Sequence, residues 1–204
     1  MSDLTGMDVL MVVASNNFRD EEYREPAEAL ARAMAGVVVA SSSKHECTGM
    51  LGYKITPDLL LSEVDLSKYA AVVFIGGSGA VEYFEDPTAQ KLARDALAQG
   101  KLVGAICIAP SILANAGLLK GKRATCFSSE KANLTTKGAE FVGEGVVRDG
   151  KIITADGPSS AKAFANAMSE ALEQEQTRLR GTQAGARGTP ESPDSERARE
   201  AGRM

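Results

Sequence analysis

The residue that points most directly to chemistry is Cys107, which lies within residues 104–110. An apolar run ends at Ile106 and a helix is expected to begin near Ala109, so Cys107 falls in a sharp strand-to-helix turn. Small residues two positions to either side, Ala105 and Ala109, let such a strained turn form without clashes. The turn would project the sulfur over the carboxyl end of the sheet, where the N–H groups of the helix start stabilise a thiolate. We predict a nucleophilic or reactive thiol; the alternative is a buried structural cysteine.

Glycines follow a second apolar run, in residues 74–79. Because they have no side chain, Gly76 and Gly77 let a ligand approach the backbone and leave N–H groups free to bind an oxyanion. A plain tight turn is the alternative. A phosphate-binding loop is excluded because no Gly-Lys-Ser or Gly-Lys-Thr sequence follows.

Acidic residues cluster in residues 17–26, directly after the first apolar run. At a helix start, Asp20 and Glu21 would complement the helix dipole, which is the simplest interpretation. A glutamate that points inward beside a thiolate would instead have a raised pKa, remain protonated and donate a hydrogen bond or a proton. This segment and Cys107 are expected at the same edge of the sheet.

Apolar runs and amphipathic segments alternate along the chain and must position these residues. The apolar runs are hydrophobic on both faces, as strands of a helix-covered parallel sheet are; they are residues 7–14, 37–40, 70–75 and 102–106. Helices are predicted over residues 21–34, 88–99 and 160–174, and a hairpin over residues 146–153. This order predicts an α/β fold, a three-layer α/β/α sandwich with a mostly parallel central sheet.

The composition of the chain changes after residue 176. Beyond it the chain is rich in Gly, Pro, Ser and Arg, and its only large apolar residues are Leu179 and Met204. Such a segment cannot bury enough surface to offset the entropy lost on ordering. We therefore expect one folded domain over residues 1–176 and a disordered tail over residues 177–204.

The overall composition excludes several classes of function. A net charge of −4 over 204 residues argues against a nucleic-acid binder, and no apolar run reaches the roughly 18 residues that a membrane span needs. Three scattered cysteines, Cys47, Cys107 and Cys126, favour a reducing, cytoplasmic setting over a disulfide framework. The single histidine, His45, lies in a polar loop and excludes multi-histidine metal sites, so we expect no metal.

Taken together, residues 6–176 resemble the ThiJ/PfpI superfamily. Three motifs carry the resemblance: the acidic opening that ends at Pro26, the Gly76-Gly77 strand end, and Ala-Ile-Cys-Ile-Ala-Pro around Cys107. Residues 48–52 and 156–158 are also similar. The resemblance implies a flavodoxin-like, class I glutamine amidotransferase-like sandwich and a homodimer or higher homo-oligomer.

The resemblance assigns roles to individual residues of this chain. Glu22 matches the active-site glutamate of the family, and Cys107 matches its nucleophile. Gly76 or Gly77, together with Ile108, would supply backbone N–H groups to an oxyanion.

The chain departs from the family pattern at several of these positions. Many members have a histidine directly after the cysteine, whereas this chain has Ile108; a Cys-His-acid triad is therefore not expected, and the chain is more similar to the deglycase branch. Cys126 stands where some members keep a histidine, and is either a buried strand cysteine or a resolving thiol. Arg19 replaces an acidic residue and could pair with Asp156 at the pocket mouth. Cys126, Arg19 and Asp156 are thus candidates for a supporting role.

These residues predict a cofactor-independent cysteine enzyme that acts on small reactive carbonyls such as 2-oxoaldehydes. Cys107 would attack the aldehyde and Glu22 would transfer protons, as in a glyoxalase or deglycase. The alternative from another class is an oxidative-stress-sensing or chaperone-like protein that uses oxidation of Cys107. A peptidase of the PfpI type is disfavoured by Ile108.

Overall fold

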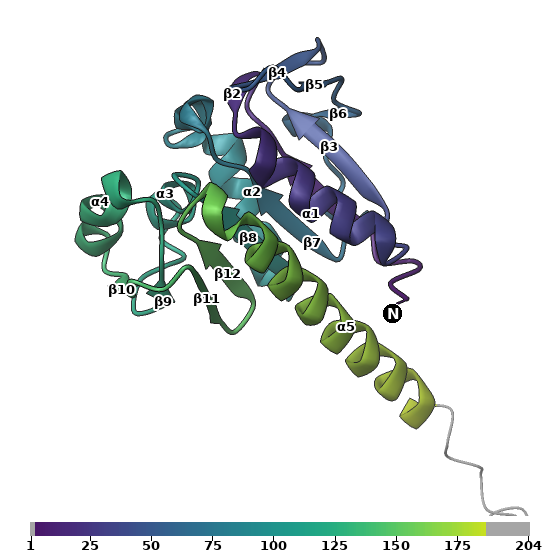
Figure 1. Cartoon of the computed structure of the whole chain (residues 1–204). Coiled ribbons are helices and arrows are strands. Elements are labelled where there is room, and N and C mark those ends of the chain that lie inside the picture. The colour runs from purple at the N-terminus through teal and green to yellow at the C-terminus, as the bar shows by residue number, and fades with distance from the viewer. Residues whose placement is uncertain (1–2, 187–204) are drawn as a thin grey trace, which may run out of the picture. The chain divides into compact units, whose positions relative to one another are not determined.

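A seven-stranded sheet forms the centre of the computed structural model, which describes residues 3–186 (Figure 1). The strand order is β11-β12-β8-β7-β1-β3-β6, and every pair is parallel except the β11–β12 hairpin. The strands are β1 (Val9–Val12), β3 (Val37–Ser41), β6 (Leu59–Leu60), β7 (Ala71–Phe74), β8 (Leu102–Ile106), β11 (Val146–Asp149) and β12 (Ile152–Ala155). All residues of β1, β7 and β8 are buried, which explains why these runs in the sequence lack polar alternation.

Helices cover both faces of this sheet and complete the three-layer α/β/α sandwich (Figure 1). The helices are α1 (Asp20–Arg32), α2 (Pro87–Ala98), α3 (Pro110–Asn115), α4 (Lys131–Thr136) and α5 (Ala161–Ala186). Helix α1 and residues 161–173 of α5 lie on one face, and α2 and α3 lie on the other. Gly104 of β8 admits Phe164 and Met168 of α5, whose atoms lie 3.0 and 2.9 Å from the place where a Cβ would be.

Two smaller sheets flank the carboxyl end of the central sheet. One contains β2 (Asn16–Phe18), β4 (Cys47–Gly49) and β5 (Lys54–Ile55), and the other contains β9 (Arg123–Ala124) and β10 (Glu140–Phe141). The buried carboxylate of Asp20, in the first turn of α1, accepts hydrogen bonds from the N–H groups of Leu51 (2.9 Å) and Tyr53 (2.8 Å). Asp20 therefore fixes the β4–β5 loop to the start of α1, a role beyond the dipole interaction expected from the sequence.

The structure confirms the predicted strands and the hairpin, and corrects the end of the last helix. Helix α5 continues to Ala186, so residues 177–186, where we expected disorder, are helical. Arg, Leu, Gln and Ala in this segment favour a helix without burial, and the pair of Arg178 with Glu175 (3.1 Å), one turn earlier, adds support. The chain divides into two compact units after Glu173, and the rest of the expected tail, residues 187–204, lies outside the described residues.

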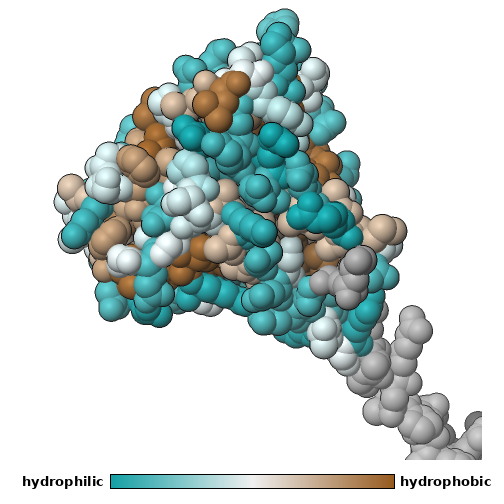
Figure 2. All heavy atoms as spheres, in the orientation of Figure 1, coloured by the Kyte–Doolittle hydropathy of each residue, from teal (hydrophilic) through white to brown (hydrophobic). Residues whose placement is uncertain are grey.

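Polar and apolar side chains are interspersed over the face of the molecule in Figure 2. Within residues 3–186, no helix has the length and apolar character that a membrane span requires.

Replacing Asp20 with Ala is expected to lower the free energy of unfolding by about 1–3 kcal/mol, because a buried carboxylate is removed and two backbone N–H groups lose their acceptor. Urea unfolding measures this change. Asp95→Ala, which removes an exposed carboxylate paired with Lys91, serves as the control and should cost less than about 0.5 kcal/mol. Equal losses in the two variants would contradict the role of Asp20.

Candidate active site

Cys107 lies in the turn between β8 and α3, as the sequence predicts. Its φ of +65° is in the left-handed region, which costs a residue with a side chain roughly 1–2 kcal/mol. Two hydrogen bonds hold the turn: the Cys107 N–H donates to the Ala155 carbonyl (2.9 Å), and the Cys107 carbonyl accepts from the Phe127 N–H (2.7 Å). The strained backbone is therefore fixed by β12 on one side and by the segment after β9 on the other.

The Cys107 side chain is 8% exposed and reaches a cavity of about 390 Å³. Most of the cavity wall is apolar, and its large apolar side chains are Met50, Val81, Ile108, Phe127 and Pro158. The cavity is at the small end of the range for small-molecule sites. The sulfur is thus neither sealed in the core nor open to bulk water.

Glu22, in the first turn of α1, is fully buried against Cys107. Neither of its carboxyl oxygens has a hydrogen bond of ordinary geometry within the described residues. Burial favours the neutral form and raises the pKa of Glu22 to about 8, while contacts with Cys107 and the Gly76 backbone oppose part of this shift. Glu22 therefore carries a proton at neutral pH.

Gly76 makes this approach of carboxyl and thiol possible. A Cβ at this position would lie 2.5 Å from the Cys107 Cβ and 2.5 Å from Glu22 Oε2, so any side chain would separate the two groups. Gly77 has a φ of +96°, and a Cβ there would lie 2.3 Å from the backbone nitrogen of Arg19. Both glycines are required by space and backbone conformation, which a plain tight turn would not explain.

The thiol and the carboxyl ionise as a coupled pair. Burial raises the pKa of Cys107, and a negative charge on Glu22 would raise it further, to about 12, whereas the N–H groups of Gly77 and Ile108 oppose the shift. The site therefore accepts one negative charge far more readily than two. Burial therefore opposes the thiolate that the sequence predicts, and ionisation of Cys107 depends on Glu22 keeping its proton.

Arg19 and Asp156 do not form the pair that the sequence suggested. The Arg19 guanidinium donates two hydrogen bonds to Glu21, at 2.8 and 3.0 Å, because the two side chains are adjacent at the start of α1. Asp156 accepts a hydrogen bond from Ser160 Oγ (2.6 Å) and lines a different cavity, of about 330 Å³. Arg19 lines the Cys107 cavity, and Asp156 does not.

Cys126 also faces the second cavity rather than the cavity of Cys107. It is buried, and burial together with the charge of Glu130 raises its pKa to about 12. Phe127 and Pro158 line both cavities and separate them. This placement favours a structural cysteine over a resolving thiol.

Sequence reasoning missed Glu130, which lines the Cys107 cavity. No motif marks it, because it approaches from η4 (Ser128–Glu130), a short 3-10 turn after β9. Its carboxylate accepts hydrogen bonds from Ser111 Oγ (2.7 Å) and Ser129 Oγ (2.8 Å). His45 is exposed on a loop outside this cavity, and residues 3–186 contain no cluster of metal-binding side chains.

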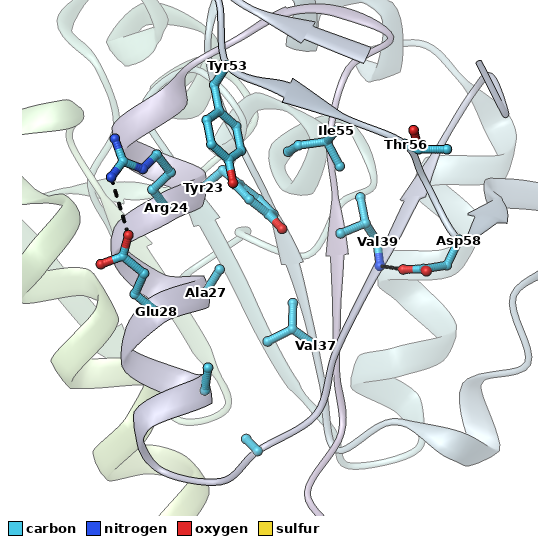
Figure 3. Close-up of a pocket in the computed structure, with 12 residues that line it drawn as sticks. Tyr23, Arg24, Ala27, Glu28, Val37, Val39, Tyr53, Ile55, Thr56 and Asp58 are labelled. Atoms are coloured by element: carbon cyan, nitrogen blue, oxygen red, sulfur yellow. Dashed lines mark hydrogen bonds and ion pairs between the residues drawn. The ribbon is translucent and has the colours of Figure 1, made fainter. Parts of the chain in front are cut away.

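A further cavity, of about 430 Å³, lies between α1, β3 and the segment around β5 (Figure 3). The rings of Tyr23 and Tyr53 face each other there with centroids 6.0 Å apart, and Arg24 lies 5.6 Å from the Tyr53 ring. Asp58 accepts a hydrogen bond from the Val39 N–H (2.8 Å). None of its described lining residues is a cysteine, so this cavity offers no thiol nucleophile.

The raised pKa of Glu22 predicts a pH dependence of stability. Glu22 has an ordinary carboxyl pKa in the unfolded chain and a pKa of about 8 in the folded one, so the folded state binds more protons between these values. The stabilisation that the proton on Glu22 gives to the folded state is complete below about pH 4.5 and is lost as the pH rises through 8. Between pH 5 and 8 the wild type should therefore lose on the order of 3 kcal/mol more unfolding free energy than Glu22→Gln.

Urea unfolding at pH 5, 6, 7 and 8 measures this difference. Glu28→Gln, on the exposed side of the same helix, should keep the pH dependence of the wild type. Parallel curves for the wild type and Glu22→Gln would contradict a protonated Glu22.

Comparison with known proteins identifies relatives over most of the chain. Residues 7–171 match the model of the DJ-1/PfpI family. An uncharacterized protein of Methanocaldococcus jannaschii is 41% identical over 168 residues, which cover 81% of this chain and 82% of that protein. Deglycase PfpI of Pyrococcus furiosus is 30% identical, and the match covers 76% of this chain and 93% of that protein. A glutathione-independent glyoxalase of Caenorhabditis elegans is 29% identical, and the match covers 80% of this chain and 88% of that protein.

Solved structures show the same architecture. A ThiJ/PfpI domain protein from Brachyspira murdochii superposes with a TM-score of 0.81 at 36% identity, over 85% of this chain and 99% of that one. Sequence and fold agree over the whole region that contains Glu22, Gly76 and Cys107, and the chain belongs to the DJ-1/PfpI family.

Proposed function

We propose that this protein is a cofactor-independent cysteine enzyme that converts 2-oxoaldehydes to 2-hydroxy acids. The observation that carries the proposal is the buried, protonated Glu22, which faces the Cys107 thiol at the wall of a small cavity. A paired nucleophile and proton carrier is what such a conversion needs. The names deglycase and glyoxalase among more distant relatives support the same class of chemistry.

The reaction begins when Cys107 gives its proton to solvent and the resulting thiolate attacks the aldehyde carbon. A carbon–sulfur bond forms, and the carbonyl oxygen takes the proton of Glu22 to give a hemithioacetal. The N–H groups of Gly77 and Ile108, which contact the sulfur and favour its negative charge, would stabilise the developing oxyanion.

Glu22, now a carboxylate, then removes the proton from the former aldehyde carbon and returns it to the neighbouring ketone carbon, while the proton of the hemithioacetal hydroxyl passes to the ketone oxygen. The first carbon is oxidised and the second is reduced within one molecule, so no external oxidant or cofactor is needed. The product is a thioester of a 2-hydroxy acid on Cys107. Water attacks this thioester while Glu22 accepts a proton from it, which releases the acid and restores the thiolate and the neutral carboxyl.

Methylglyoxal tests the proposal, with lactate measured in the absence of glutathione. Cys107→Ala should abolish lactate formation, and Glu22→Gln should lower kcat/KM by at least about 100-fold, because proton transfer is lost. Cys126→Ser and Cys47→Ser, which alter thiols outside the cavity, are the matched controls and should remain active.

Lactate formation that survives Cys107→Ala would contradict the proposed function. If the wild type makes no lactate, but peroxide oxidises Cys107 selectively over Cys47 and Cys126 in peptide mass spectrometry, an oxidation sensor becomes the better description. Glu22 and the neighbouring N–H groups would then stabilise an oxidised sulfur instead of a reaction intermediate.

We also propose that the protein forms a homodimer or higher homo-oligomer. Large apolar side chains remain exposed on the single chain, among them Met34 (66%) and Leu51 (64%), and association would remove such surface from water. Sedimentation velocity at micromolar concentration should give a mass of at least two chains. A strict monomer would contradict the proposal.

The cytoplasm is the setting that we propose for this enzyme. All three cysteines are free, and the mechanism needs a reduced Cys107. Fractionation of the source cells with a tagged chain tests this, and recovery outside the cytoplasmic fraction would contradict it.

A further inference from the structure

The Cys107 cavity has an apolar wall with two charged side chains, Arg19 and Glu130. These two differ in how their charge is balanced. Arg19 forms a two-bond ion pair with Glu21, which leaves little net charge on that side. Glu130 has no lysine or arginine partner within residues 3–186.

The cation nearest to Glu130 in sequence does not neutralise it. Lys131 extends its ammonium group over the Phe141 ring, 4.9 Å from the centroid. Glu130 is only partly exposed, so its carboxylate is less screened than one on the open surface. The cavity that contains the nucleophile therefore also holds an unbalanced negative charge.

Two serine hydroxyls fix the orientation of this carboxylate. Ser111 Oγ donates to Glu130 Oε2 (2.7 Å) and Ser129 Oγ donates to Glu130 Oε1 (2.8 Å). Ser111 is fully buried in α3, one helical turn after Cys107, so the carboxylate is tied to the same element that follows the nucleophile. A carboxylate offers about four acceptor positions, and each oxygen of Glu130 keeps capacity for a further donor.

We propose that Glu130 is a specificity-determining residue that binds a cationic group of the substrate while the carbonyl carbon of that substrate reaches Cys107. The inference rests on the proposed function and narrows its substrate class to small carbonyl compounds that also carry an ammonium or guanidinium group. The apolar wall would contact the chain between the two ends. The cavity of about 390 Å³ limits the substrate to a small molecule.

Thiol-reactive probes of different charge test this without any turnover. The cationic probe is 2-aminoethyl methanethiosulfonate, the neutral one is methyl methanethiosulfonate, and the anionic one is 2-sulfonatoethyl methanethiosulfonate. The thiolate attacks the sulfenyl sulfur, a disulfide forms and methanesulfinate leaves. Peptide mass spectrometry follows modification at Cys107, and each rate is divided by that of free 2-mercaptoethanol with the same probe.

In the wild type, the normalised rate should be highest for the cationic probe and lowest for the anionic one. Glu130→Gln keeps the shape of the side chain and should lower the ratio of cationic to neutral rates roughly five-fold at low salt. Ser111→Ala, which releases one carboxylate oxygen, should lower the ratio by a smaller factor. Glu140→Gln removes an equal charge outside the cavity and should leave the ratio unchanged.

An equal ratio in the wild type and Glu130→Gln would overturn the inference, as would a wild type in which the cationic probe fails to modify Cys107. A merely structural role for Glu130 would change all three rates together and leave their ratios intact. The proposed function fails separately, since it is judged by lactate formation and the probes need no catalysis.

Discussion

The site is built around a buried carboxyl and a buried thiol that must share their protons. Glu22 and Cys107 are both removed from water, and each would resist ionisation alone. Burial keeps both groups protonated near neutrality, and a charge on one strongly disfavours a charge on the other. Because Gly76 has no side chain, the Glu22 carboxyl and the Cys107 thiol can lie in contact, and this contact determines the chemistry of the cavity.

The order of strands in the central sheet makes this contact possible. Glu22 follows β1, Gly76 follows β7 and Cys107 follows β8, and these three strands are consecutive in the sheet. Parallel strands present their carboxyl ends at one edge, so three segments distant in sequence meet there. The left-handed turn at Cys107 depends on the same arrangement, because β12 and the segment after β9 supply its hydrogen bonds.

Much of the fold was predictable because it rests on local patterns. The apolar runs of β1, β3, β7 and β8 and the Asp-Gly hairpin turn specify their own structure. A strand was expected around Arg123, where β9 lies, but the pairing of β9 with β10 and of β2, β4 and β5 into small sheets was not predicted, since strands of two or three residues leave no periodic signal. The helical continuation of α5 was also missed, because low apolar content was taken to exclude a helix that charged residues can support.

By itself, the sequence determined that a cysteine occupies a strained turn at the end of a parallel strand, and that glycines end a neighbouring strand. Those features are local, since turn chemistry and hydrophobic periodicity act over a few residues. Only the tertiary structure decided that Glu22 points at the sulfur, that Arg19 pairs with Glu21, and that Glu130 joins the cavity wall. These relations are long-range. They depend on which side chains share a volume closed to water, where burial and the nearest charge set the protonation of each group.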